Sequence, residues 1–172
     1  MEILEGPWII FFVRWLHVVS GIMWIGLLWY FNFVQIPSMP KIPDEHKPAI
    51  SKVIAPEALF WFRWAALSTI IFGLIQALQL GFLRDGLLLG IASNSAYHMM
   101  IGLGMWMGLI MAANVWFVIW PNQKKALGMV EAAAEEKAAA ARMAMLFSRT
   151  NTMLSIPMLY AMVSVHFFQM SG

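Results

Sequence analysis

Three histidines in strongly apolar parts of this chain are its clearest candidates for chemistry: His17, His98 and His166. An ionisable side chain is costly inside a membrane, so such a residue is by default a candidate for function. Imidazoles from neighbouring helices are common axial ligands of a b-type haem in a helical bundle. The sequence therefore predicts a haem b iron that is ligated by two of these three histidines.

Arg14 and several small residues accompany the histidines. Arg14 lies three residues before His17, about one helical turn away, where its guanidinium could pair with a haem propionate. Small side chains would leave room for a flat macrocycle, and those near the first two histidines are Ser20, Gly21 and Gly102. The alternative is that each histidine only hydrogen-bonds to a neighbouring helix, and the sequence leaves both interpretations open.

Two of the 15 methionines share a helical spacing with a histidine. Met158, Met162 and His166 follow one another at intervals of four residues, which places them on one helix face. Soft thioether and imidazole ligands suit Cu(I), so this stripe could handle copper. Such a stripe is more often core packing, because methionine fills irregular gaps between helices.

A second set of polar side chains lies at the opposite ends of the apolar runs. It could form a pocket for a polar ligand or for a quinone head group, although polar residues near helix ends also serve as caps. The predicted pocket residues are Asn32, Gln35, Asn114, Asn122, Arg149 and Asn151.

The composition indicates a protein whose solvent is lipid. Hydrophobic residues make up 61% of the 172 residues and charged residues only 12%, whereas soluble domains carry about 25% charged residues. The formal net charge of +2 is too small to suggest a nucleic-acid partner. The chain contains no Cys, which excludes disulfides, cysteine-ligated zinc, iron–sulfur clusters and covalently attached haem.

Four apolar runs are long enough to cross a bilayer, which takes roughly 20 helical residues. The predicted spans are residues 7–36, 57–83, 88–120 and 143–170. We therefore predict an all-α fold, an integral membrane four-helix bundle that forms a single domain over residues 1–172. The segment Lys124–Arg142 is rich in Ala, Glu and Lys and is predicted to be a water-exposed amphipathic helix that leads into the fourth span.

Prolines and small residues add detail to this bundle. Pro37 and Pro40 are predicted to end the first helix, and Pro121 the third, because proline has no backbone N–H. Pro157 is predicted to kink the fourth span. The start of the third helix stays open between residues 88 and 95. A small-xxx-small ridge, predicted to contact another helix or another subunit, consists of Gly104, Gly108 and Ala112.

The distribution of Lys and Arg predicts the orientation of the chain. Basic residues gather in the first and third connections, so these are predicted to be cytoplasmic. Both termini are then periplasmic if the chain crosses a bacterial inner membrane four times. The basic residues of the two connections are Lys41, Lys47, Lys52, Lys124, Lys125, Lys137 and Arg142.

Three long segments of the chain carry a family resemblance. They are WLHVVSGIMWIGLLWYFNFVQIP from Trp15, NVWFVIWPNQKKALG from Asn114 and SRTNTMLSIPMLYAM from Ser148. These segments resemble the membrane region of the bacterial membrane-bound, cytochrome-c-linked urate oxidase (urate hydroxylase) family. The resemblance implies urate oxidation, with electrons passed to a cytochrome c domain. The CxxCH motif of that domain is absent here, so the chain resembles a short form that would need an external acceptor.

The leading hypothesis is a membrane haem b redox protein that passes electrons between a small substrate or a quinol and a periplasmic acceptor such as a cytochrome c. The first alternative is a non-catalytic accessory subunit, which would pack in the bilayer against a larger respiratory or photosynthetic complex or against copies of itself. The second alternative is copper handling. The sequence assigns no catalytic acid or base.

Overall fold

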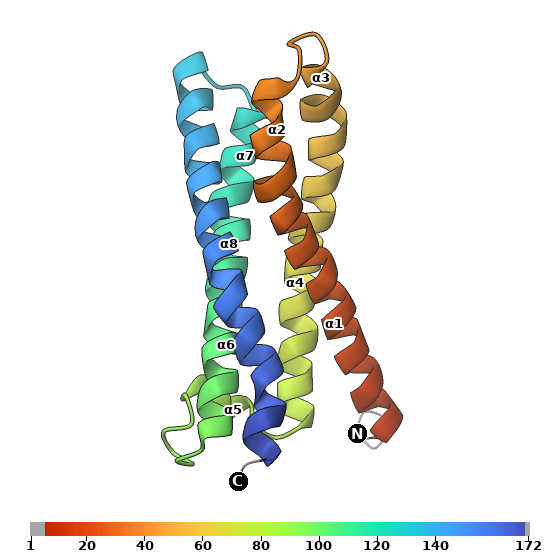
Figure 1. The fold of residues 1–172 in the computed structure, drawn as a ribbon, viewed down its shortest axis with the longest axis vertical. Coiled ribbons are helices and arrows are strands. Elements are labelled where there is room, and N and C mark those ends of the chain that lie inside the picture. The colour runs from red at the N-terminus through yellow and green to blue at the C-terminus, as the bar shows by residue number, and fades with distance from the viewer. Residues whose placement is uncertain (1–5, 171–172) are drawn as a thin grey trace.

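The structure of the protein is a computed structural model, which describes residues 6–170 and the side chains up to Ser164. These residues form an all-α four-helix bundle, as the sequence predicted (Figure 1). The α-helices are α1 (Pro7–Trp29), α2 (Ile36–Ser38), α3 (Lys47–Ala49), α4 (Ala55–Gln79), α5 (Leu83–Leu87), α6 (Ala96–Ala113), α7 (Trp120–Ala126) and α8 (Ala134–Met170). Between them lie a 3₁₀ turn at Met39–Lys41 and three π-helical segments, which are Tyr30–Gln35, Ile50–Ile54 and Asn114–Ile119.

Several of these elements join end to end into longer rods. Pro7–Lys41, Lys47–Gln79 and Ala96–Ala126 are each continuous, and each is long and apolar enough to cross a membrane by length and composition. α8 is a fourth rod of 37 residues, which joins the predicted water-exposed helix to the fourth apolar run without a break. Within the described residues α8 does not reach the same apolarity, because a polar stretch at residues 148–152 interrupts it. A membrane crossing by α8 therefore stays a prediction.

In the first three rods, three prolines follow π-helical segments and lie inside the rods instead of ending them. Pro37, Pro56 and Pro121 each stand two residues after the end of a π-helical segment. In each case the residue before the proline donates its N–H to the carbonyl five residues back. Proline normally clashes with the carbonyl four residues back, and the wider π turn gives the ring room. The donor and acceptor pairs are Ile36 and Phe31, Ala55 and Ile50, and Trp120 and Val115. The prediction that Pro37 and Pro121 end helices is therefore wrong.

The third rod begins late, at Ala96. The Ser95 side chain caps it by accepting a hydrogen bond from the His98 backbone N–H at 3.4 Å. The apolar residues before it form the short helix α5 and a tight loop, in which Leu89, Gly90 and Asn94 have positive φ values of 53°, 66° and 46°. The second rod likewise differs from its predicted bounds, because it begins at Lys47 and ends at Gln79.

The bundle consists of two antiparallel pairs of rods. α1 packs along α4, and α6 with α7 packs along α8 (Figure 1). Large apolar side chains join the two pairs, among them Trp24, Leu28, Phe62 and Met111. The start of α1, α5 and the end of α8 lie at one end of the bundle, which we call the termini end. The opposite end carries the connection between α2 and α3 and the start of α8, and we call it the far end (Figure 1).

Glycines in α6 allow two close contacts. A Cβ atom on Gly104 would lie 3.3 Å from the Cβ of Ala161 and 3.1 Å from Cε of Met162, so α6 and α8 pack closely there. This confirms the predicted helix contact of the small-residue ridge. A Cβ on Gly102 would lie 2.1 Å from the carbonyl oxygen of Gly86 in α5. Gly102 therefore accommodates the α5 backbone.

Replacement of Gly102 by Ala should destabilise the protein markedly. The added methyl group would overlap a backbone carbonyl that cannot rotate away, and overpacking of this kind costs about 1–3 kcal/mol or more. The matched control is Gly26→Ala in α1, where nothing lies within 4 Å of the added Cβ. The control should be neutral or stabilise by up to about 1 kcal/mol, because Ala favours a helix. Thermal unfolding of both variants in detergent tests this, and equal melting temperatures would contradict the contact.

Candidate functional site

His17 lies between α1 and α4. Its Nδ1 is 2.9 Å from the backbone carbonyl oxygen of Thr69, and because a carbonyl only accepts, Nδ1 carries the hydrogen. Gly73 makes room for the ring, since a Cβ there would lie 2.8 Å from the imidazole Cε1. The hydrogen bond to a neighbouring helix, which the sequence left as one of two interpretations, is thus present. In the neutral ring Nε2 keeps its lone pair.

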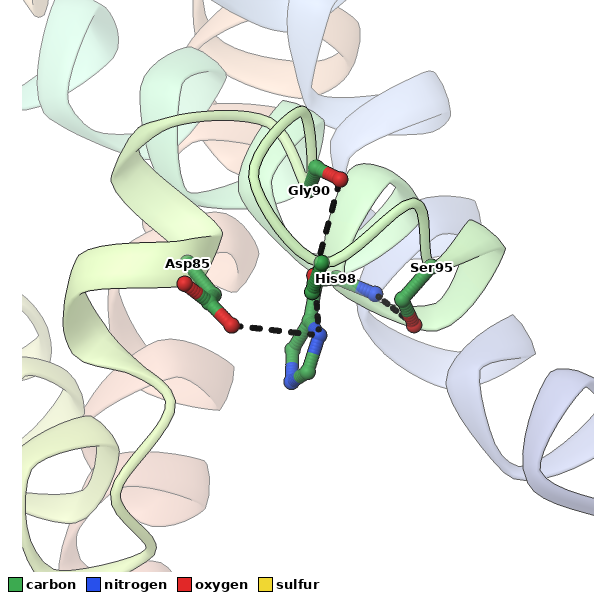
Figure 2. A network of polar contacts seen from close by, with 5 residues as sticks. Asp85, Gly90, Ser95 and His98 are labelled. Atoms are coloured by element: carbon green, nitrogen blue, oxygen red, sulfur yellow. Dashed lines mark hydrogen bonds and ion pairs between the residues drawn. The ribbon is translucent and has the colours of Figure 1, made fainter.

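His98 lies in the first turn of α6, at the termini end. Its Nδ1 is 3.1 Å from Ser93 Oγ, and the Ser93 hydroxyl in turn donates to the Gly90 carbonyl at 3.5 Å. The Asp85 carboxylate is 3.8 Å from the same nitrogen, so it favours a hydrogen there (Figure 2). Serine and aspartate thus face one nitrogen, whereas a nucleophilic triad needs the serine on Nε2. The Nε2 of His98 points away from both partners (Figure 2).

The packing of the helices sets the relative levels of the three histidines. Gly104 faces Ala161 and Met162 across antiparallel α6 and α8. His98 lies six residues from Gly104 toward the termini end, roughly 9 Å, and residue 166 lies four residues from Met162 in the same direction, roughly 6 Å. The two positions are therefore level to within one helical turn. The side chain of His166 itself lies outside the described side chains.

His17 lies at a different level. Its partner segment in α4 includes Ile70, whose Cδ1 would be 3.9 Å from a Cβ on Gly108 in α6. Gly108 is ten residues beyond His98, which corresponds to roughly 15 Å along the helix. His17 is therefore about three helical turns deeper in the bundle than His98. Within the described residues no three His, Asp or Glu side chains converge as metal ligands would.

The residues predicted to accompany the histidines lie in different surroundings. Arg14 is exposed, and its charge reaches the hydroxyl of Tyr97, whose ring centroid is 5.1 Å from that of His98. Gly21 packs on α4, where an added Cβ would be 3.8 Å from Cγ2 of Thr69. Ser20 is half-buried in the same helix.

The methionine stripe of α8 lies in a packed interface. Met158 is 6% exposed and belongs to the hydrophobic core, and Met162 packs on the same core and against Gly104. Packing accounts for both side chains, so the structure adds nothing in favour of copper.

Several of the predicted pocket residues join different helices through hydrogen bonds. Asn32 Nδ2 donates to Ser148 Oγ at 2.8 Å and to the Leu28 carbonyl at 2.9 Å. Asn151 is fully buried, accepts from Asn114 Nδ2 at 2.8 Å and donates to the Met111 carbonyl at 2.9 Å. These bonds hold α8 against the first and third rods.

The other three predicted pocket residues differ in their contacts and in their exposure. Asn122 donates to the Val118 carbonyl of its own helix at 2.8 Å, as a local cap does. Arg149 is exposed on α8. Gln35 lines a cavity of about 210 Å³ at the far end, and its Oε1 is buried without a hydrogen-bond partner. We call this space the far-end cavity, and it is lined by Phe31, Gln35, Ile36, Ala55, Leu59, Phe62, Ile119, Gln123, Leu127, Ala141, Met145 and Ser148.

The sequence interpretation missed Gln123 and Ser148 as part of this cavity. Ser148 opens the polar segment that also holds Arg149 and Asn151, so its presence there was the available signal. Which of these neighbours turns inward depends on the rotation of α8, and the sequence does not specify that rotation.

Replacement of Asn151 by Ala should lower the stability of the bundle by about 1–2 kcal/mol, because it removes the hydrogen bond to the Met111 carbonyl and leaves the Asn114 side-chain amide unpaired. Asn122→Ala is the matched control, and it should cost about 0.5 kcal/mol or less because its amide serves only its own helix. Denaturation of both variants in detergent measures the difference. Equal losses would show that the buried amide does not tie α6 to α8.

The comparison with known protein families concerns the second half of the chain. The sequence model described as "Urate oxidase N-terminal" matches residues 87–172, which is half of the 172 residues. The match covers α6, α7 and α8, with His98, the Asn114–Asn151 pair and Ser148 among its residues. No curated protein and no solved structure matches the chain. On this match, the chain belongs to the urate oxidase N-terminal family.

Proposed function

We propose that this chain is a membrane haem b redox protein related to the membrane part of cytochrome-c-linked urate oxidases. It passes electrons between a small substrate or a quinol and a periplasmic acceptor. The family match and the apolar rods support a membrane protein of this kind. The observation that carries the haem proposal is the state of His98, whose Nδ1 is engaged while Nε2 remains available.

His98 and His166 are the residues that would hold the haem iron. A metal-bound histidine usually donates its other N–H to a carboxylate, a carbonyl or a similar acceptor, which fixes the tautomer and the ring orientation. Ser93 Oγ supplies such an acceptor at 3.1 Å from His98 Nδ1, and the Asp85 carboxylate adds a negative charge 3.8 Å from the same nitrogen. Residue 166 is level with His98 on the adjacent helix, and for this reason we propose His166 as the second ligand. When bound, the haem supplies reversible one-electron transfer at its iron.

The remaining groups have supporting roles in this proposal. The charge of Arg14 acts on the Tyr97 hydroxyl in the first turn of α6, so it would also act on a propionate held there. His17 is three helical turns away and hydrogen-bonded to Thr69, so we assign it to the contact between α1 and α4. The Asp85 carboxylate makes the His98 imidazole a stronger electron donor by accepting charge from Nδ1–H.

The visible spectrum of each histidine variant tests the assignment of ligands. Wild-type protein made with an adequate haem supply should show a b-type α band in the dithionite-reduced minus air-oxidised spectrum. His98→Ala and His166→Ala should each lose this band, because a six-coordinate haem needs both ligands. His17→Ala should keep the band and lower the melting temperature, because it loses only the bond to Thr69.

Two results would contradict the proposal in different ways. A wild-type spectrum without any b-type band would remove haem altogether. A band that is lost in His17→Ala and kept in His98→Ala would leave haem in place and overturn the assigned pair.

Asp85→Asn should raise the midpoint potential of the haem. Loss of the negative charge 3.8 Å from His98 Nδ1 makes the imidazole a weaker donor and so favours the reduced iron. Asp44→Asn is the control, because Asp44 lies in the connection between α2 and α3 at the far end and pairs there with Lys47. A spectroelectrochemical titration measures both, and unchanged potentials in the two variants would argue against His98 as a ligand.

A further inference from the structure

The far-end cavity is lined by residues of all four rods, and its lining is neutral. Its walls are mostly apolar, and its polar lining residues are Gln35, Gln123 and Ser148. No Asp, Glu, Lys or Arg is among its lining residues. An anion or a cation in this space would have no compensating charge, so the lining selects a neutral molecule.

Two polar groups in the lining are available to a ligand. The Oε1 of Gln35 is a buried acceptor without a partner, which favours a ligand that donates a hydrogen bond. The Oγ of Ser148 accepts from Asn32 Nδ2, and its own hydrogen remains free to donate. The Asn32 amide cannot be flipped, because its Nδ2 also donates to the Leu28 carbonyl. Gln35 and Ser148 thus offer one acceptor and one donor within a mostly apolar space, beside the amide of Gln123.

The three π-helical segments lie around this cavity. The first contributes Phe31 and Gln35 to the lining, Ala55 directly follows the second, and Ile119 ends the third. Such segments are rare, and they occur frequently at functional sites. Each is followed by a proline, so the sequence itself maintains them. This is a second reason, independent of the polar groups, to regard the cavity as a binding site.

We infer that the far-end cavity binds the head group of a quinol, that is, a neutral hydroquinone ring. Its volume of about 210 Å³ suits one substituted ring, since a cavity of about 150 Å³ is enough for benzene. One quinol hydroxyl can donate to Gln35, and an oxygen of the ring can accept from Ser148. The oxidised quinone has only acceptors and cannot satisfy Gln35 Oε1.

The same chemistry could reach the cavity from two sources. A quinol of the membrane carries a long apolar tail, whereas a soluble neutral phenol enters from water without one. We assign the membrane quinol, because the rods that enclose the cavity are apolar enough to lie in lipid. The inference concerns binding only and does not require the proposed haem.

Calorimetric titration of the protein in nanodiscs under anaerobic conditions tests this inference. Decylubiquinol should bind, and decylubiquinone should bind more weakly. Gln35→Leu should weaken quinol binding roughly tenfold, because it removes the acceptor. Ala141→Phe should abolish binding, because Ala141 is an exposed residue in the lining, so a large ring there closes the mouth of the cavity. The matched control is Gln76→Leu in α4, outside the cavity lining, which should bind as the wild type does.

The possible results distinguish a membrane quinol from a soluble phenol, from urate and from the absence of a ligand. Decylubiquinol that binds more tightly than its tail-less hydroquinone supports the membrane source, and equal affinities overturn it in favour of a soluble phenol. The inference is overturned if the wild-type protein shows no heat of quinol binding and its melting temperature is the same with and without the quinol. Binding of urate that depends on Gln35 would overturn it too. The histidine variants of the haem test should all bind the quinol normally, so failure of one proposal is distinguishable from failure of the other.

Discussion

Backbone hydrogen bonding within lipid is the constraint on which this structure depends. A peptide group in the bilayer core finds no water, so each N–H and C=O needs a partner in the chain. Each of the four rods nevertheless contains a proline at a position where a helix would lose such a bond, and in three of them a π-helical segment precedes it. The π turn before Pro37, Pro56 and Pro121 keeps the backbone paired by bonds that reach back five residues instead of four. The rods therefore remain continuous, and the wider turns collect around one cavity at the far end.

The same constraint explains how polar side chains are used between the helices. The buried amide of Asn151 finds its partners in the Met111 carbonyl and the Asn114 amide, and the Nδ1–H of His17 finds its partner in the Thr69 carbonyl. Trp29 likewise donates to Ser155 Oγ at 2.9 Å across the α1–α8 contact. Lipid offers helices no hydrophobic reason to associate, so small residues and such polar pairs must hold them together. Gly104 and Asn151 together show both devices in the α6–α8 contact.

The sequence predicted the helical class, the rods and their order, because long apolar runs have few other solutions in lipid. It could not predict how far along the bundle axis His98 lies. The apolar residues 87–91 appear to continue the third span, yet a tight loop with Gly90 in the left-handed region separates them from α6, and Ser95 caps the new helix. The prediction that Pro37 and Pro121 end helices was wrong for a related reason. A π turn forms as part of the packed structure, and the local sequence preferences do not reveal it. The roles of Asn122 and Arg149 depended on the rotation of their helices, which only packing fixes.

The two proposed sites lie far apart, and this separation limits what either one implies about the other. His98 is in the first turn of α6 at the termini end, and Ile119 of the cavity lining is 21 residues further along the same rod. At about 1.5 Å per residue this is roughly 32 Å, close to the thickness of the hydrocarbon core. A quinol in the cavity would therefore face one side of the membrane, and a haem held by His98 the other. Electron transfer between them would need an intermediate carrier, so quinol binding alone would not identify the donor of the haem. His98 and the cavity at Gln35 therefore lie at opposite ends of the bundle, and each proposal about them stands on its own evidence.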